Sequence, residues 1–219
     1  MNKAKVSTIL KCENLLGESC FWDPRYNCLV WTDIEAKKAW MLDDNNQSFT
    51  FNLPDRAGFI LPRKREGFII GFPNFIAISD KNFSSFEKIC EVEITNNQTR
   101  INDAKVDPYG GIVFGTYNED PDKAKRKPIA NLYRLAPNLS LTHLLSNITV
   151  SNGIAFSEDE NIMYFADTPT GRIQKFEYTK NFNKFYELET NMIFKNVGEP
   201  DGATVDVDNN YWSARVRGK

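Results

Sequence analysis

Short apolar runs alternate with polar turns along the whole chain. The runs are rich in aromatic and β-branched residues and end at Asp, Asn, Gly or Pro, which is typical of β-strands, whereas the 3.6-residue period of amphipathic helices is weak. A polar turn that leads into such a run occurs five times. The strands predicted after these turns cover residues 29–33, 68–71, 112–115, 162–167 and 211–214. The pattern therefore predicts an all-β protein.

The residue before each of these runs gives the repeat a measurable period. These residues are Cys28, Gly67, Gly111, Asn161 and Asn210, at spacings of 39, 44, 50 and 49. A strand unit that recurs every 40–50 residues is typical of propeller blades, each a four-stranded sheet. Three units continue into a further predicted strand, at 38–42, 131–135 and 172–176. A two-sheet sandwich is the alternative, but its turns recur every 8–12 residues without a longer period.

Composition and charge narrow the possible functions. The net charge of −2 argues against a nucleic-acid binder, which normally carries a basic stripe. No segment reaches the roughly 20 apolar residues that a membrane span needs, and the basic N-terminus lacks the apolar region of a signal peptide. The cysteines form no C-x-x-C pair, so we expect reduced, buried thiols in a cytoplasmic protein.

The chain contains a single histidine, His143. One histidine excludes two-histidine zinc sites and leaves little room for a Ser-His-Asp triad. His143 lies in a strand-like run away from the motifs described next, so we expect a structural role for it. The one basic run, residues 123–128, is expected to be a solvated loop.

Four short motifs occur in order, each just before one of the repeated turns. They are GESCFWD at 17–23, RINDAKVDP at 100–108, SNGIAFS at 151–157 and PDGATVD at 200–206. They resemble the patterns G-E-G-P-x-W, R-x-N-D-G, S-N-G-[IL]-x-[WF]-S and P-D-G-[LM]-x-x-D of one family. That family joins gluconolactonases, the senescence marker protein regucalcin and the luciferin-regenerating enzymes. Each motif alone is a weak signal, but four in the right order are specific. The resemblance covers residues 16–219.

The resemblance implies a six-bladed β-propeller with one divalent metal ion on its central axis. By similarity, the metal ligands are Glu18, Asn152 and Asp201, and Asn102 is a weaker ligand or a substrate contact. An all-oxygen set of this kind suits Ca²⁺ best, with Mg²⁺, Mn²⁺ or Zn²⁺ as alternatives. Taken singly, each of these residues is more often a solvated acid or part of a turn. The order of the motifs is what makes them candidates.

The blade count is smaller than the resemblance implies. At roughly 45 residues per blade, six blades need about 270 residues. The 219 residues of this chain hold about four and a half blades. The chain also ends just after a predicted strand, where a hairpin partner should follow. We therefore expect residues 1–219 to form a single propeller domain that lacks its C-terminal blade or blades.

The function implied by the resemblance is metal-dependent hydrolysis of a sugar lactone. The metal would polarise the lactone carbonyl, and Asp201 would activate the attacking water. Arg100 and Asn102 would orient the sugar, and Glu119 or Asp120 could contact its hydroxyl groups. The expected partner is thus a small sugar lactone, with no nucleic acid and no membrane, and the oligomeric state is open. Two alternatives remain: a non-catalytic calcium-binding protein, and a truncated, inactive lactonase homologue.

Three departures from the family patterns stand close to these residues. Ser19 and Cys20 replace Gly-Pro after the glutamate, Ala104 replaces a glycine, and Tyr117 stands where methionine is common. The change at 104 matters only if that position needs a positive φ. Because none of the three is a proposed ligand, we expect them to alter substrate preference more than metal binding.

Overall fold

The structure, a computed structural model, describes residues 7–157, 161–179, 187–188 and 197–218. The N-terminal residues 1–6 and the predicted turn residues 158–160 lie outside these ranges. Within them, 18 strands form five antiparallel sheets, and the only helices are two 3-10 turns, η1 (Lys123–Lys125) and η2 (Thr168–Thr170). Neither of these helices has the length or the apolar character needed to cross a membrane.

Each sheet is built from strands that are consecutive in the chain. The first sheet contains β1 (Gly17–Asp23), β2 (Cys28–Asp33), β3 (Lys38–Asp43) and β4 (Ser48–Asn52). The second contains β5 (Phe59–Pro62), β6 (Phe68–Phe72), β7 (Phe75–Ser79) and β8 (Phe86–Glu91). The third contains β9 (Thr99–Val106), β10 (Ile112–Asn118), β11 (Ala130–Leu135) and β12 (Leu141–Ile148). The fourth contains β13 (Ser151–Ser157), β14 (Ile162–Asp167), β15 (Arg172–Glu177) and β16 (Glu187–Leu188). The last pairs β17 (Glu199–Val205) with β18 (Tyr211–Val216).

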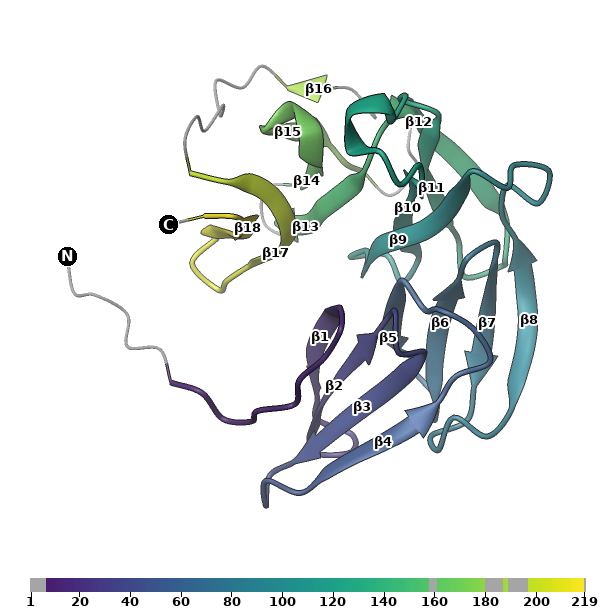
Figure 1. Cartoon of the computed structure of the whole chain (residues 1–219), viewed down its shortest axis with the longest axis vertical. Coiled ribbons are helices and arrows are strands. Elements are labelled where there is room, and N and C mark those ends of the chain that lie inside the picture. The colour runs from purple at the N-terminus through teal and green to yellow at the C-terminus, as the bar shows by residue number, and fades with distance from the viewer. Residues whose placement is uncertain (1–6, 158–160, 180–186, 189–196, 219) are drawn as a thin grey trace.

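The sheets are arranged as propeller blades. Their first strands, β1, β5, β9, β13 and β17, lie innermost around a common centre (Figure 1). The repeat seen in the sequence marks the turn into the second strand of each blade, at the start of β2, β6, β10, β14 and β18. The prediction of an all-β chain with about four and a half propeller blades is confirmed: the described residues form four four-stranded sheets and one two-stranded sheet.

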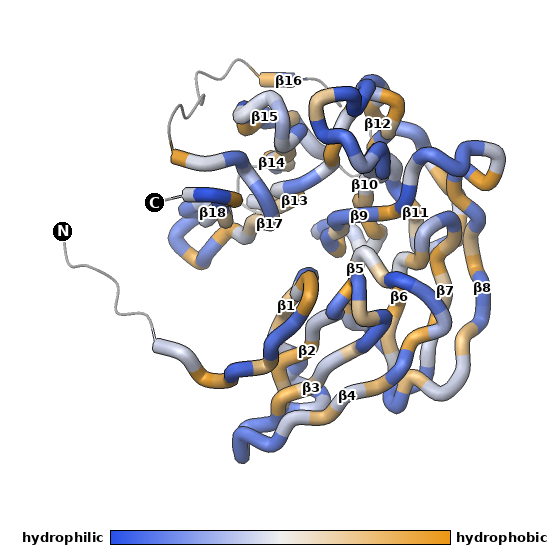
Figure 2. The backbone as a smooth tube through the Cα atoms, in the orientation of Figure 1, coloured by the Kyte–Doolittle hydropathy of each residue, from blue (hydrophilic) through white to orange (hydrophobic). Residues whose placement is uncertain are grey.

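The hydrophobic core is divided among the junctions between neighbouring blades. One cluster joins Val30 of the first blade to Phe68 of the second, and another joins Phe59 of the second to Phe114 of the third. Hydrophobic stretches lie along the strands, and hydrophilic turns lie at the tips of the sheets (Figure 2). Burial at these junctions fixes each blade against the next and so sets where the inner strands meet.

The cysteines depart in part from the expectation of burial. Cys28, in the core between the first two blades, is buried, whereas Cys20 is exposed. The prediction of a buried thiol at Cys20 was therefore wrong. Cys20 follows the alternation of β1 and lies on the same face of the strand as Trp22, which is also exposed, whereas Phe21 and Asp23 point to the more buried face.

Candidate functional site

A β-bulge or similar irregularity falls on the motif residues of four inner strands. The pairing register shifts between Glu18 and Phe21 in β1, and between Asn152 and Ala155 in β13. In β9 the shift leaves residues 102–103 opposite a single residue of β10, and in β17 it covers residues 200–203. The inner strand β5, which carries no motif, pairs regularly. Bulges re-aim side chains at sheet edges, so the motifs mark the places where inner strands turn side chains out of the regular pleat.

Buried aspartates fix the chain just before two of these bulges. The carboxylate of Asp33, at the end of β2, accepts the N–H groups of Leu15 and Leu16, both at 3.0 Å. Asp167, at the end of β14, accepts those of Thr149 and Val150 at 3.1 and 2.8 Å. In each blade the second bonded residue lies two positions before the candidate metal ligand, Glu18 or Asn152. In both blades, the aspartate at the end of the second strand therefore fixes where the candidate ligand lies along the inner strand.

Three carboxylates from three different blades influence one another across the centre. Burial, together with the negative charges of Asp201 and Asp103, raises the pKa of Glu18 from 4.5 to about 8. Burial raises the pKa of Asp103 to about 6, although its carboxylate accepts the Ile154 N–H at 3.1 Å. The pKa of Asp201 is also raised by burial. Glu18 and Asp103 both line a cavity of about 820 Å³.

This arrangement fits a divalent cation. Within the described part of the chain, the Glu18 carboxylate makes no hydrogen bond and no ion pair, and the negative charges of Asp201 and Asp103 act on it. Partly desolvated like charges are costly unless a positive charge offsets them. No three Asp, Glu, His or Cys side chains of the described residues form a close ligand cluster. A metal ion held here would therefore need amide as well as carboxylate oxygens, a hard set that suits Ca²⁺ or Mg²⁺.

The amide of Asn152 is held in one orientation by buried neighbours. Its Nδ2 donates to Thr168 Oγ1 at 2.8 Å, and this hydroxyl in turn donates to the carbonyl of Pro200 at 2.8 Å. Asn102 Nδ2 donates to the Ser151 carbonyl at 2.9 Å and lies 3.4 Å from Asn152 Oδ1. The residue before Asp201 is thereby tied to the candidate ligand on the neighbouring blade. Second-layer bonds of this kind set the direction of metal ligands.

The glycine after Asn152 is required by close approach. Gly153 has a φ of +65°, and a Cβ there would stand 2.6 Å from the Tyr211 hydroxyl. Tyr211 donates that hydroxyl to the Gly153 carbonyl at 2.9 Å. A side chain at this position would therefore push the fourth blade away from the β17–β18 hairpin. The Asn-Gly pair, which by itself indicates only a tight turn, is here a contact between blades.

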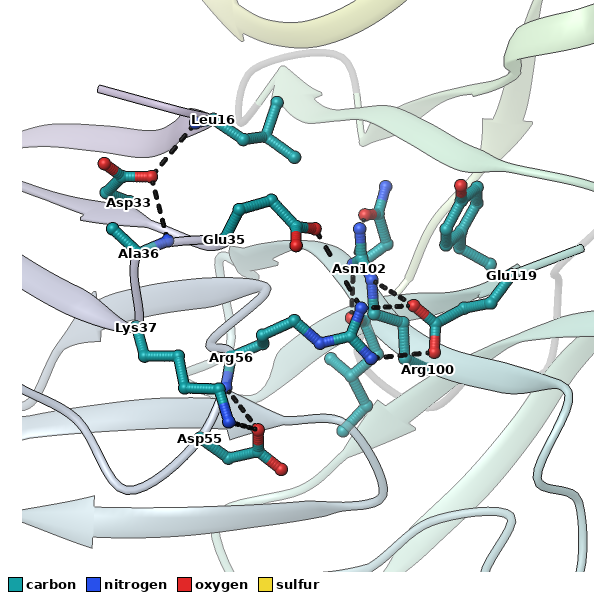
Figure 3. Close-up of polar contacts among 12 residues, drawn as sticks. Leu16, Asp33, Glu35, Ala36, Lys37, Asp55, Arg56, Arg100, Asn102 and Glu119 are labelled. Carbon is teal, nitrogen blue, oxygen red and sulfur yellow. Dashed lines mark hydrogen bonds and ion pairs between the residues drawn. The ribbon is translucent and has the colours of Figure 1, made fainter. Parts of the chain in front are cut away.

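A cluster of charged and amide groups lies beside the candidate metal ligands. Arg100, only 5% exposed, donates from Nη1 to Asn102 Oδ1 at 2.7 Å, and its Nε lies 3.3 Å from a Glu119 oxygen. Figure 3 shows these three residues side by side. Because Asn102 also contacts Asn152, the guanidinium and the candidate metal ligands form one continuous polar surface. Such a surface offers both donors and acceptors to the hydroxyl groups of a sugar.

Tyr117, where the family pattern has methionine, packs against two guanidinium groups. Arg100 and Arg126 lie 4.6 and 4.7 Å from its ring centre, and Arg126 donates to its hydroxyl at 2.5 Å. Arg126 belongs to the basic run predicted to be a solvated loop, and its contact with Tyr117 supports the site. Asp120 serves its own loop, where its carboxylate accepts the Asp122 N–H at 3.0 Å. A substrate contact at Asp120 stays a prediction.

The other departures from the family patterns differ in effect. Ala104 has no positive φ, so a glycine is not needed there. Ser19 does have a positive φ, +57°, and its hydroxyl both accepts the Ile60 N–H at 3.1 Å and donates to the Ile60 carbonyl at 3.0 Å. His143 is exposed on the outer strand β12 and bonds to Asn131 and Ser146. His143, Asn131 and Ser146 all belong to the third blade, so these hydrogen bonds lie within one blade.

Three residues of the site were not predicted from the sequence: Asp103, Thr168 and Arg56. Asp103 stood inside a motif beside Asn102, so its position was a usable signal. Thr168 follows the predicted strand 162–167 without any spacing that points to Asn152. Arg56 donates to both oxygens of Glu119, at 2.6 and 3.0 Å, from 63 residues away in the chain. No local pattern predicts such a partner.

Comparison with known proteins identifies relatives of similar sequence and similar fold. Residues 16–219 match the family described as SMP-30/Gluconolactonase/LRE-like region. Regucalcin from Danio rerio is 30% identical over 227 residues, which cover 100% of this chain and 74% of the relative. L-arabinolactonase from Azospirillum brasilense is 31% identical, and the match covers 94% of this chain and 69% of the relative. A solved structure of luciferin-regenerating enzyme superposes with a TM-score of 0.86 at 26% identity. The superposition covers 94% of this chain and 70% of that structure's chain.

Proposed function

The chain belongs to the SMP-30/Gluconolactonase/LRE-like family, and from that premise we propose that it hydrolyses a sugar lactone with the help of one divalent metal ion. The observation that carries the proposal is the electrostatic influence of Asp103 and Asp201 on Glu18, beside a guanidinium–amide cluster. Family members named as lactonases support the reaction class. The sugar lactone is accordingly the proposed partner.

The proposed metal ligands are Glu18, Asn152 and Asp201, with Asn102 as a weaker ligand or substrate contact. The carboxylates of Glu18 and Asp201 already act on each other electrostatically, and the Asn152 amide is oriented by Thr168. Ca²⁺ suits this oxygen set best. When bound, the ion supplies Lewis-acid stabilisation of the negative charge that develops on the lactone carbonyl oxygen.

The chain's own residues would do the remaining work. Arg100, Asn102 and Glu119 bind the sugar hydroxyls and orient the ring. Asp201 accepts a proton from water as the water oxygen bonds to the carbonyl carbon. The ring C–O bond then breaks, and the proton passes to the leaving alkoxide, which yields a hydroxy acid. A carboxylate can serve as the base in such a reaction where a bound cation lowers the pKa of the attacking water.

A cytoplasmic location also belongs to the proposal. All four cysteines are free in the structure, which a reducing compartment favours. Treating the purified chain with a thiol reagent and counting labelled cysteines by mass spectrometry, before and after reduction, tests the state of these thiols.

Hydrolysis of glucono-δ-lactone, followed by proton release with and without EDTA, tests the main proposal. We expect release by the wild type that EDTA abolishes and Ca²⁺ restores. Asp201→Asn should remove turnover, whereas Glu199→Gln, an exposed carboxylate on the same strand, should leave it unchanged. Full activity in Asp201→Asn would refute the assignment of the base. Metal binding without turnover of any sugar lactone would instead favour a calcium-binding protein.

A further inference from the structure

Arg56 lies in the connection between β4 and β5 and reaches the third blade. Its two terminal nitrogens donate to the two oxygens of Glu119 at 2.6 and 3.0 Å, a forked pair between planar groups. Its Nη1 also lies 3.9 Å from a carboxylate oxygen of Glu35, in the turn after β2. Figure 3 shows Arg56 between these two glutamates. One side chain thus links the first blade to the third.

Glu119 is shared between two guanidinium groups. The oxygen that accepts from Arg56 Nη1 also lies 3.3 Å from Arg100 Nε. This Nε is buried and has no hydrogen-bond partner within the described residues, so the Glu119 carboxylate is the negative charge that faces it. Burial lowers the pKa of Arg100, and Glu119 opposes that shift. The direction in which the Arg100 guanidinium points therefore depends on where Glu119 is held.

We propose that Arg56 is a positioning residue for substrate binding, acting through Glu119 on Arg100 and thus on Asn102. The inference rests on the function proposed above for these residues. A carboxylate held by two parallel bonds cannot rotate away, so Glu119 stays within reach of Arg100. Arg100 in turn keeps its bond of 2.7 Å to Asn102. Without Arg56, Glu119 can turn toward solvent, and the sugar-binding groups lose their fixed arrangement.

The same connection offers a matched control. Lys37 pairs with Asp55, the residue before Arg56, at 2.9 Å, and both side chains of this pair are about half exposed. An exposed pair of this kind contributes little to stability. Neither residue contacts Glu119 in the described structure. Loss of the Lys37 charge should therefore leave the substrate-binding groups unchanged.

The experiment compares Arg56→Met, Arg56→Lys and Lys37→Met in two assays, after circular dichroism has established that each variant folds. The first assay measures KM and kcat for glucono-δ-lactone, and the second measures binding of D-gluconate by calorimetry. We expect Arg56→Met to raise both KM and the gluconate Kd about tenfold, with kcat changed less than about threefold. Arg56→Lys keeps the charge but not the fork, so its values should lie between. Lys37→Met should match the wild type.

The outcomes separate this inference from the proposed function. Equal KM values for Arg56→Met and Lys37→Met, or a loss confined to kcat, would overturn the positioning role. No turnover by the wild type would refute the proposed function, and Arg56 would then be judged on gluconate alone. Weaker gluconate binding by Arg56→Met than by Lys37→Met supports the inference. Equal binding, or no gluconate binding by any variant, overturns it. If Arg56→Met does not fold, Arg56→Lys is judged by the same criteria.

Discussion

Ser19, next to the candidate metal ligand Glu18, combines backbone strain with hydrogen bonds that offset it. Its φ of +57° lies in the left-handed region that favours glycine. Its hydroxyl accepts from the Ile60 N–H and donates to the Ile60 carbonyl, 41 residues away on the second blade. Serine at this position strains the backbone but adds two hydrogen bonds between β1 and β5. Two substitutions at this position separate the contributions.

The magnitudes follow from these contacts. Ser19→Ala keeps the strained backbone and loses both bonds to the buried Ile60, at about 1–1.5 kcal/mol each, or about 2–3 kcal/mol together. Ser19→Gly loses the same bonds but relieves about 1 kcal/mol of left-handed strain. We therefore expect the order of stability Ser, then Gly, then Ala. In a domain of this size, 1 kcal/mol corresponds to roughly 2–4 °C in Tm.

Urea and thermal unfolding, followed by circular dichroism in EDTA, measure the difference. Ser19→Ala should melt roughly 2–4 °C below Ser19→Gly, and both should melt below the wild type. Cys20→Ser, at the exposed neighbouring position, is the control and should change stability by less than about 0.5 kcal/mol. An alanine variant as stable as the wild type, or more stable than the glycine variant, would show that the reasoning about strain and bonding is wrong.

Three further predictions follow from buried contacts. Thr168→Val removes the hydroxyl that orients Asn152 and should weaken Ca²⁺ binding, measured by calorimetry, by about tenfold or more, whereas Thr170→Val in the same turn should not. Because the folded-state pKa of Glu18, about 8, lies above its ordinary 4.5, its contribution to metal-free stability is complete below about pH 4.5 and is lost as the pH rises through 8. Thermal melts in EDTA should therefore fall over that range, with a smaller fall in Glu18→Gln; equal slopes would contradict this assignment. Asp107→Ala removes a buried carboxylate that pairs with Arg134 and accepts the Gly111 N–H and the Tyr178 hydroxyl, and it should cost about 3–5 kcal/mol in urea unfolding; a loss below about 1 kcal/mol would refute this.

The sequence alone determined the blades and the order of the motifs. Strand alternation and turn chemistry are local properties, so the spacing of Cys28, Gly67 and Gly111 could predict where each second strand begins. Glu18, Asn152 and Asp201 could be chosen because each occurs in a motif of fixed local form. The core at the blade junctions follows from the same local pattern, since successive residues of a strand point to opposite faces: Phe68 and Ile70 pack toward the first blade and Ile69 toward the third.

What only the tertiary structure decided is how these residues act on one another. The bulge that re-aims Glu18 depends on the pairing register of β1 with β2, which the residue pattern does not encode. The contact of Ser19 with Ile60 and the fork of Arg56 on Glu119 join residues 41 and 63 positions apart. Such partners are set by the packing of whole blades against each other. Interactions between charged residues far apart in the chain therefore arise only once the inner strands converge, whereas the strands themselves are determined by the local sequence.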